Sequence, residues 1–357
     1  MYIYYYEKLH PLNSLGGGDF TNSRFAPGYL FLTSLFKTFT PDFTYFQIFH
    51  SIIINCVVFA FIRRYCKHVF FGLLLFFFYL YVYLLFEQMR ESFAVAIFLL
   101  AWPAFKKGVW WKWYIAAFCA IMFHVSAFIM FILPLICLPG IRELFKFGRR
   151  TWYICLAIFV GAFIIQTVFF RYIEALTITE SMLERVQTYG NIKRSEILNI
   201  NRIIGVTIQY IAYPLMALYV ISLGRDKNIY NYSKDTSEFN KETMMVLMSI
   251  YISIFTIFIG IFIRYNNYFF LFAIIMMADW AFTRLYLFKK FIRVGYLYWI
   301  LLFLPMISVN FYFTYLTAVN KAETLYSYMR YYPYSSIFDQ NMDVNREKTI
   351  LYIRRKN

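Results

Sequence analysis

Three charged residues stand close together between two strongly apolar stretches. In FEQMRESFAV (86–95), Glu87, Arg90 and Glu91 follow LLLFFFYLYVYLL and precede FAVAIFLLAW. A guanidinium group can hold two phosphate oxygens at once, and a carboxylate can take a proton from a hydroxyl group. The stretch therefore has the groups needed to bind an anion and move a proton. An interfacial turn whose side chains reach water would use the same residue types.

Two more stretches place ionisable residues among apolar ones. His124 stands in FCAIMFHVSAFIM (118–130), and Arg264 stands in IFIRYNNYFF (261–270). Imidazole gains and loses a proton near neutral pH, which suits acid–base chemistry, while a hydrogen-bonded core histidine is the structural alternative. We expect these residues to meet Arg90 at the external ends of their segments.

The composition sets the class of protein that must position these residues. Of 357 residues, 61% are hydrophobic and 23% aromatic, and the mean hydropathy is +0.55. These values predict an all-α, polytopic integral membrane protein. The five cysteines have no CxxC spacing, so we interpret them as core residues. The net charge of +16 fits basic loops that orient a membrane protein better than nucleic-acid binding.

Apolar segments of spanning length recur along the chain. They lie at about 44–62, 69–86, 91–105, 113–138, 152–170, 204–223, 244–263, 267–283 and 296–316.

The fourth segment decides the topology. If 113–138 crossed once, the four basic residues of PGIRELFKFGRRT (139–151) would lie outside, against the positive-inside rule. Two short arms that turn near Phe123-His124-Val125-Ser126 return this loop to the cytoplasm. We therefore expect nine to ten membrane-inserted helices in one domain, with both termini external. Four parts lie outside the spans: an external loop (1–43), an external amphipathic segment (171–203), a cytoplasmic loop (224–243) and a C-terminal tail (317–357).

Four stretches resemble one known family. MRESFAVAIFLLAWPAFKKGVWWKWYIAAFCAIMFHVSAFIMFILPL (89–135) is similar to the central signature of the EpsG family of bacterial exopolysaccharide proteins. GGGDFTNSRFAPGYLFLTSLF (16–36) resembles the family's G-D…P-G-[YF] loop, IRYNNYFF (263–270) its late arginine-tyrosine segment, and YYPYSSIF (331–338) its terminal motif. The acidic residue common before Pro-Gly is Ala26 here, so Asp19 remains as the acid of that loop.

The resemblance implies a Wzy-like fold of the GT-C kind and a polymerase. Such an enzyme joins undecaprenyl-diphosphate-linked oligosaccharide repeat units into O-antigen or exopolysaccharide at the outer face of the bacterial inner membrane. Its donor and acceptor are lipid-linked oligosaccharides, and its candidate protein partners are a chain-length regulator and a flippase. No cofactor and no metal are expected, because no external loop carries a DxD-like pair.

The resemblance and the chemistry together give candidate roles. Arg90 and Arg264 would bind diphosphate. His124 would take the proton of the acceptor hydroxyl, with Asp19, Glu87 and Glu91 as alternatives. The tyrosines of the three flanking motifs, Tyr29, Tyr265 and Tyr334, are further substrate-binding candidates.

Two other functions compete with polymerisation. A transporter or flippase of lipid-linked oligosaccharides would also need arginines along its path, but no internal repeat is visible in the chain. A membrane acyltransferase is a more distant alternative that His124 would suit.

Overall fold

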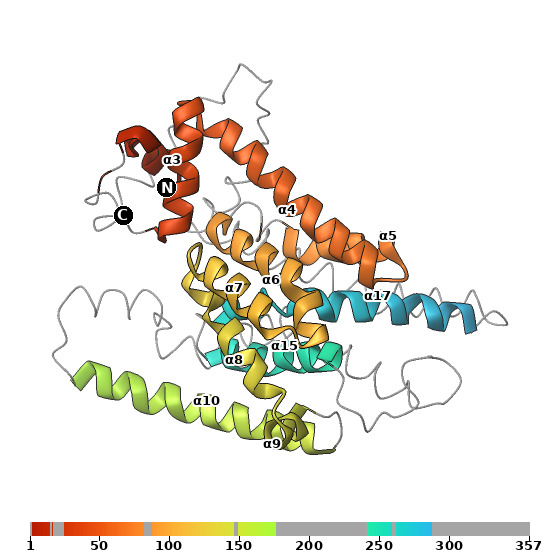
Figure 1. Cartoon of the computed structure of the whole chain (residues 1–357). Coiled ribbons are helices and arrows are strands. Elements are labelled where there is room, and N and C mark those ends of the chain that lie inside the picture. The colour runs from red at the N-terminus through yellow and green to blue at the C-terminus, as the bar shows by residue number, and fades with distance from the viewer. Residues whose placement is uncertain are drawn as a thin grey trace, which may run out of the picture.

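A computed structural model describes residues 2–14, 16, 25–81, 84, 88–145, 149–175, 241–258 and 262–287 (Figure 1). Within these ranges every regular element is a helix, in agreement with the all-α prediction. The elements are α1 (Tyr2–Lys8), η1 (Leu12–Ser14), α3 (Pro27–Phe39), α4 (Phe43–Tyr65), α5 (Val69–Phe76), η2 (Phe77–Tyr81), α6 (Met89–Lys107), α7 (Trp110–Ile121), η4 (Val125–Phe128), α8 (Ile129–Ile136), α9 (Pro139–Arg142), η5 (Glu143–Phe145), α10 (Arg149–Ala175), α15 (Lys241–Phe258), α16 (Ile263–Asn266) and α17 (Phe270–Leu287).

One helix of the described part is long and apolar enough to cross a membrane by itself. This is α4, and its bounds agree with the predicted segment 44–62. The pair Val125–Ile136 and Pro139–Phe145 would be a second such helix if it counts as one span, although it bends by 97°. Length and composition alone thus give one or two spans here, so the expected nine to ten inserted helices stay a prediction.

The first helix of the core signature, α6, runs through the centre of the fold. It packs against α4 and α7, and Figure 1 shows it between the long diagonal of α4 and the lower helices. Twelve of its 19 residues are buried, so most of the helix lies inside the fold. The helix ends at Gly108, whose φ of 72° is the left-handed conformation that glycine adopts most readily. Lys241 of α15 caps this end by donating to the carbonyl oxygens of Phe105 and Lys106.

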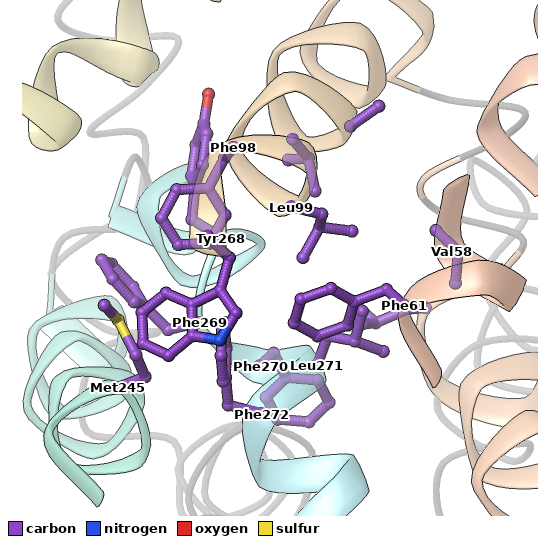
Figure 2. Packing of buried hydrophobic residues seen from close by; sticks show 14 of the residues in the cluster. Val58, Phe61, Phe98, Leu99, Met245, Tyr268, Phe269, Phe270, Leu271 and Phe272 are labelled. Carbon is purple, nitrogen blue, oxygen red and sulfur yellow. The ribbon is translucent and has the colours of Figure 1, made fainter. Parts of the chain in front are cut away.

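Aromatic side chains fill the contact between α4, α6 and α17. Phe98 of α6 lies edge-on to Tyr268 and Phe272, with ring centroids 5.5 and 6.1 Å apart. Phe272 also meets Phe61 of α4 at 5.3 Å in an edge-on contact (Figure 2). Aromatic rings prefer such edge-to-face contacts. The cluster therefore fixes both the distance between the helices and the angle between them.

The predicted break in segment 113–138 is confirmed. Helix α7 has 12 residues and ends at Ile121, and a new helical run begins at Val125. His124 lies between them with an extended backbone, φ −155° and ψ 133°. An arm of 12 residues is about 18 Å long, which is shorter than the ~30 Å hydrocarbon core. The two-armed shape is therefore established, while its depth in a membrane stays a prediction.

Two boundaries differ from the sequence prediction. The segment 1–43, expected as a loop, contains α1 and α3, because Pro27 starts a helix whose apolar residues Tyr29 and Leu30 are buried. Helix α10 continues to Ala175, which shortens the segment predicted at 171–203. The predicted spans 204–223 and 296–316 and the tail 317–357 lie outside the described residues.

Candidate functional site

A fully buried carboxylate lies at the start of α6. Glu91 has no exposed surface, and its Oε1 accepts a hydrogen bond of 2.6 Å from the Nδ2 of Asn267. Asn267 belongs to the turn between α16 and α17, 176 positions further along the chain. A buried charge needs polar or charged partners, so this contact joins two segments that the sequence keeps far apart.

Two guanidinium groups act on this carboxylate. Arg264 of α16 and Arg90 of α6 both interact electrostatically with Glu91. The same two arginines also interact electrostatically with His124. The structure thus brings Arg90, Arg264, Glu91 and His124 into one cluster, from three separate parts of the chain.

The N-terminal region reaches the same cluster. The guanidinium carbon of Arg90 lies over the ring of Phe25, 4.7 Å from its centroid. Such a contact attracts the cation to the face of the ring and holds the long side chain in one direction. Phe25 directly precedes α3, so the N-terminal region contacts Arg90 through this ring.

His124 is held through its Nδ1 atom. This atom lies 2.6 Å from the Oγ of Ser126 and accepts a hydrogen bond of 3.2 Å from the backbone N–H of Ser126. The same Oγ lies 3.0 Å from the hydroxyl oxygen of Tyr268. Ser126 and Tyr268 are both buried, so the imidazole is fixed by a chain that joins η4 to the start of α17.

Three consecutive residues that sequence analysis passed over form the hub of this arrangement. Asn266 accepts from Ser249 and donates to Ser253 of α15, at 2.7 and 3.0 Å. The next two residues, Asn267 and Tyr268, contact Glu91 of α6 and Ser126 of η4. Each residue of Asn266-Asn267-Tyr268 therefore joins α16–α17 to a different element. Two adjacent amides between apolar runs were the signal in the sequence.

The other predicted site residues have different positions. Tyr29 is buried among the rings of Phe25, Phe46 and Phe93, which is a packing position, and its substrate-binding role stays a prediction. Tyr265 is half-buried and packs on Phe262, with ring centroids 5.7 Å apart. Asp19, Glu87 and Tyr334 lie outside the described residues.

A second buried histidine supports the first turn of α6. The Nε2 of His50 lies 2.6 Å from the Oγ of Ser92, and that hydroxyl group donates to the carbonyl oxygen of Met89 at 2.8 Å. His50 is fully buried, and its ring meets Phe93 edge-on. Since Ser92 follows Glu91, this contact fixes the turn that carries Arg90 and Glu91.

Comparison with known families decides the relationship. The model of the EpsG family matches residues 1–336. The chain belongs to the EpsG family. Searches of curated proteins and of solved structures found no match. EpsG membership makes the chain a membrane protein of polysaccharide biosynthesis.

Two motifs of this EpsG chain meet in space. The Pro-Gly-Tyr motif begins α3, and the Phe-His motif follows the end of α7. Gly28 donates its backbone N–H to the carbonyl oxygen of Met122 at 2.7 Å. An N–H group at the start of one helix thus meets a carbonyl group at the end of another, where the helix dipoles are complementary. In this EpsG chain the contact joins the N-terminal region to the turn that carries His124.

Proposed function

We propose that the protein polymerises undecaprenyl-diphosphate-linked oligosaccharide repeat units at the outer face of the bacterial inner membrane. The observation that supports this most is the meeting of Arg90 and Arg264 beside His124, together with family membership. A lipid-linked sugar carries a diphosphate at the membrane surface, and two forked guanidinium groups can hold such a group through several oxygens.

The proposed reaction exchanges one bond at the anomeric carbon. An oxygen of the acceptor's hydroxyl group attacks the anomeric carbon of the donor, and the bond from this carbon to the diphosphate oxygen breaks. The hydroxyl proton passes to a base, and the lipid diphosphate leaves as an anion. Arg90 and Arg264 would stabilise the charge that develops on the leaving group, which is the part of the reaction that fixed donors assist most.

Glu91 would keep the two arginines in place. A carboxylate that interacts with two guanidinium groups reduces their mutual repulsion, and the bond from Asn267 fixes its direction. Full burial separates Glu91 from solvent. We propose Asp19 of the N-terminal loop and Glu87 as the carboxylates that could take the proton.

Reconstitution of the purified protein tests the proposal. Liposomes containing the protein and a lipid-linked repeat unit should yield products of two or more repeats without any other protein. A protein that only moves the lipid-linked unit between leaflets would leave its length unchanged. Movement without elongation would therefore refute the polymerase and favour a flippase.

A further inference from the structure

The buried chain from Tyr268 through Ser126 to His124 bears on how the imidazole is used. We infer that Ser126 and Tyr268 are positioning residues that hold the Nδ1 of His124 as an acceptor, so that His124 offers an Nε2–H donor to the diphosphate and does not take the acceptor's proton. This inference rests on the proposed function for the identity of the ligand.

The backbone N–H of Ser126 determines the state of the ring. It donates to Nδ1 at 3.2 Å, and a backbone amide keeps its hydrogen and cannot turn it away. This bond requires a lone pair on Nδ1. In a neutral imidazole one nitrogen is a donor and the other an acceptor, which places the hydrogen on Nε2.

The two hydroxyl groups agree with this assignment. Ser126 Oγ lies 2.6 Å from Nδ1 and 3.0 Å from the Tyr268 hydroxyl. Tyr268 can donate to Ser126, and Ser126 can donate to Nδ1, so that each hydroxyl hydrogen has an acceptor. The opposite tautomer could donate from Nδ1 to the Oγ of Ser126, but it would lose the bond from the amide of Ser126 and bring two hydrogens together.

The surroundings of His124 indicate what Nε2–H would bind. Arg90 and Arg264 both act on the imidazole electrostatically, and two guanidinium groups favour an anion at this place. A neutral N–H adds a hydrogen bond to a phosphate oxygen without adding a third positive charge. Within the described residues no side chain accepts from Nε2, and His124 retains some exposure at 8%.

Two substitutions separate the two ring nitrogens. In His124→Asn, the amide oxygen can accept from the N–H of Ser126, because asparagine is a strong N-cap, but the side chain is too short to replace Nε2. In His124→Gln, the amide nitrogen reaches the Nε2 position and can donate, but it cannot take up a proton. His68→Asn and His68→Gln are matched controls in the turn between α4 and α5, where His68 is the N-cap of α5.

Binding of undecaprenyl diphosphate to protein in nanodiscs is the first test. His124→Asn should weaken binding about ten- to hundredfold, the range for a hydrogen bond to a charged group, while His124→Gln should stay within about fivefold of wild type. His124→Gln should also keep polymerisation within about tenfold, whereas loss of a base costs roughly 10²–10⁴-fold. Wild-type binding by His124→Asn, or loss of more than about a hundredfold in rate by folded His124→Gln, would overturn the inference.

Nitrogen-15 NMR of histidine-labelled protein tests the ring without any substrate. The signals of His124, assigned by their loss in His124→Asn, should show a hydrogen on Nε2 and none on Nδ1. A hydrogen on Nδ1 would refute the assignment. If wild type fails to bind undecaprenyl diphosphate, the proposed function falls, and the NMR result still decides the state of the ring.

Discussion

Gly28 and Met122 touch through their backbones. The N–H of Gly28 donates to the carbonyl oxygen of Met122 at 2.7 Å, and a Cβ atom added to Gly28 would lie 2.8 Å from that oxygen. Real Cβ atoms essentially never approach an oxygen so closely, so one of the two backbones would have to move. Only glycine allows α3 to lie this close to the turn that carries His124.

We expect Gly28→Ala to displace α3 from that turn. Polymer formation should fall at least tenfold, because a displacement of about 1 Å at a catalytic group can cost 10²-fold in rate. Gly161→Ala is the matched control, since nothing lies within 4 Å of its added Cβ atom and alanine favours the helix α10. The rates of both variants in liposomes, with their melting temperatures, check the prediction. Wild-type rate in Gly28→Ala would mean that the contact does not position His124.

The contact between Glu91 and Asn267 predicts that a second substitution can rescue the loss of Glu91. Glu91→Gln removes the carboxylate with which Arg90 and Arg264 interact and should lower the melting temperature, with loss of polymer. Adding Asn267→Asp restores one carboxylate at the contact between residues 91 and 267, so the double variant should recover a large part of both properties. Thermal unfolding in detergent and the liposome assay measure the two effects.

The outcome of this rescue also identifies the role of Glu91. Stability that returns without polymer would assign Glu91 to the chemistry rather than to positioning. Glu143→Gln is the control, because Glu143 is exposed and lies 3.9 Å from Arg142, a distance at which an ion pair contributes little.

Arginine geometry should matter more than charge at the cluster. Arg90→Lys and Arg264→Lys keep the positive charge but lose the two-pronged donor, so each should reduce polymer formation at least about tenfold. Membrane insertion should be unchanged. Arg63→Lys, at the exposed end of α4, should behave as wild type. Normal polymer length and rate from both cluster variants would remove their proposed role with diphosphate.

We expect Asp279 to stabilise the fold. Its Oδ1 accepts from the backbone N–H groups of Lys67 and His68, at 2.6 and 3.1 Å, and from the thiol of Cys66 at 3.3 Å. The carboxylate of α17 thus caps the turn between α4 and α5. Asp279→Ala should lower the melting temperature, because it costs about 1–3 kcal/mol for the amides left without an acceptor. Asp279→Asn retains an oxygen and should lie closer to wild type. A larger loss of polymer than of stability in Asp279→Asn would indicate a functional acid instead.

The topology makes a prediction for chemical labelling. The basic loop 139–151 is expected in the cytoplasm, and Leu144 in it is half exposed. With the five native cysteines replaced, Leu144→Cys should react with an impermeant maleimide in inverted vesicles and not in whole cells. Phe39→Cys, exposed before α4, should show the reverse. Labelling of Leu144→Cys from outside would show that segment 113–138 crosses once.

The sequence predicted a helix correctly where one continuous stretch of residues indicated it. The bounds of α4 follow from one continuous apolar run that ends at Arg63 and Arg64. The break at His124 followed from the charges of the next loop, since a single crossing would have put them on the wrong side. By contrast, the sequence did not predict α3. This helix has only 13 residues and follows a polar stretch, and so short a helix depends on packing against another helix for its stability.

By itself the sequence determined the composition of the cluster and its family. Arg90, His124 and Arg264 stand out because ionisable groups among apolar residues are costly unless they are used. Only the tertiary structure decided which side chains of the cluster form hydrogen bonds with one another. The bond from Asn267 to Glu91 and the one from Tyr268 to Ser126 span 176 and 142 positions of the chain. Partners so distant are chosen by the packing of α6, η4 and α17, and no local spacing in the sequence encodes that packing.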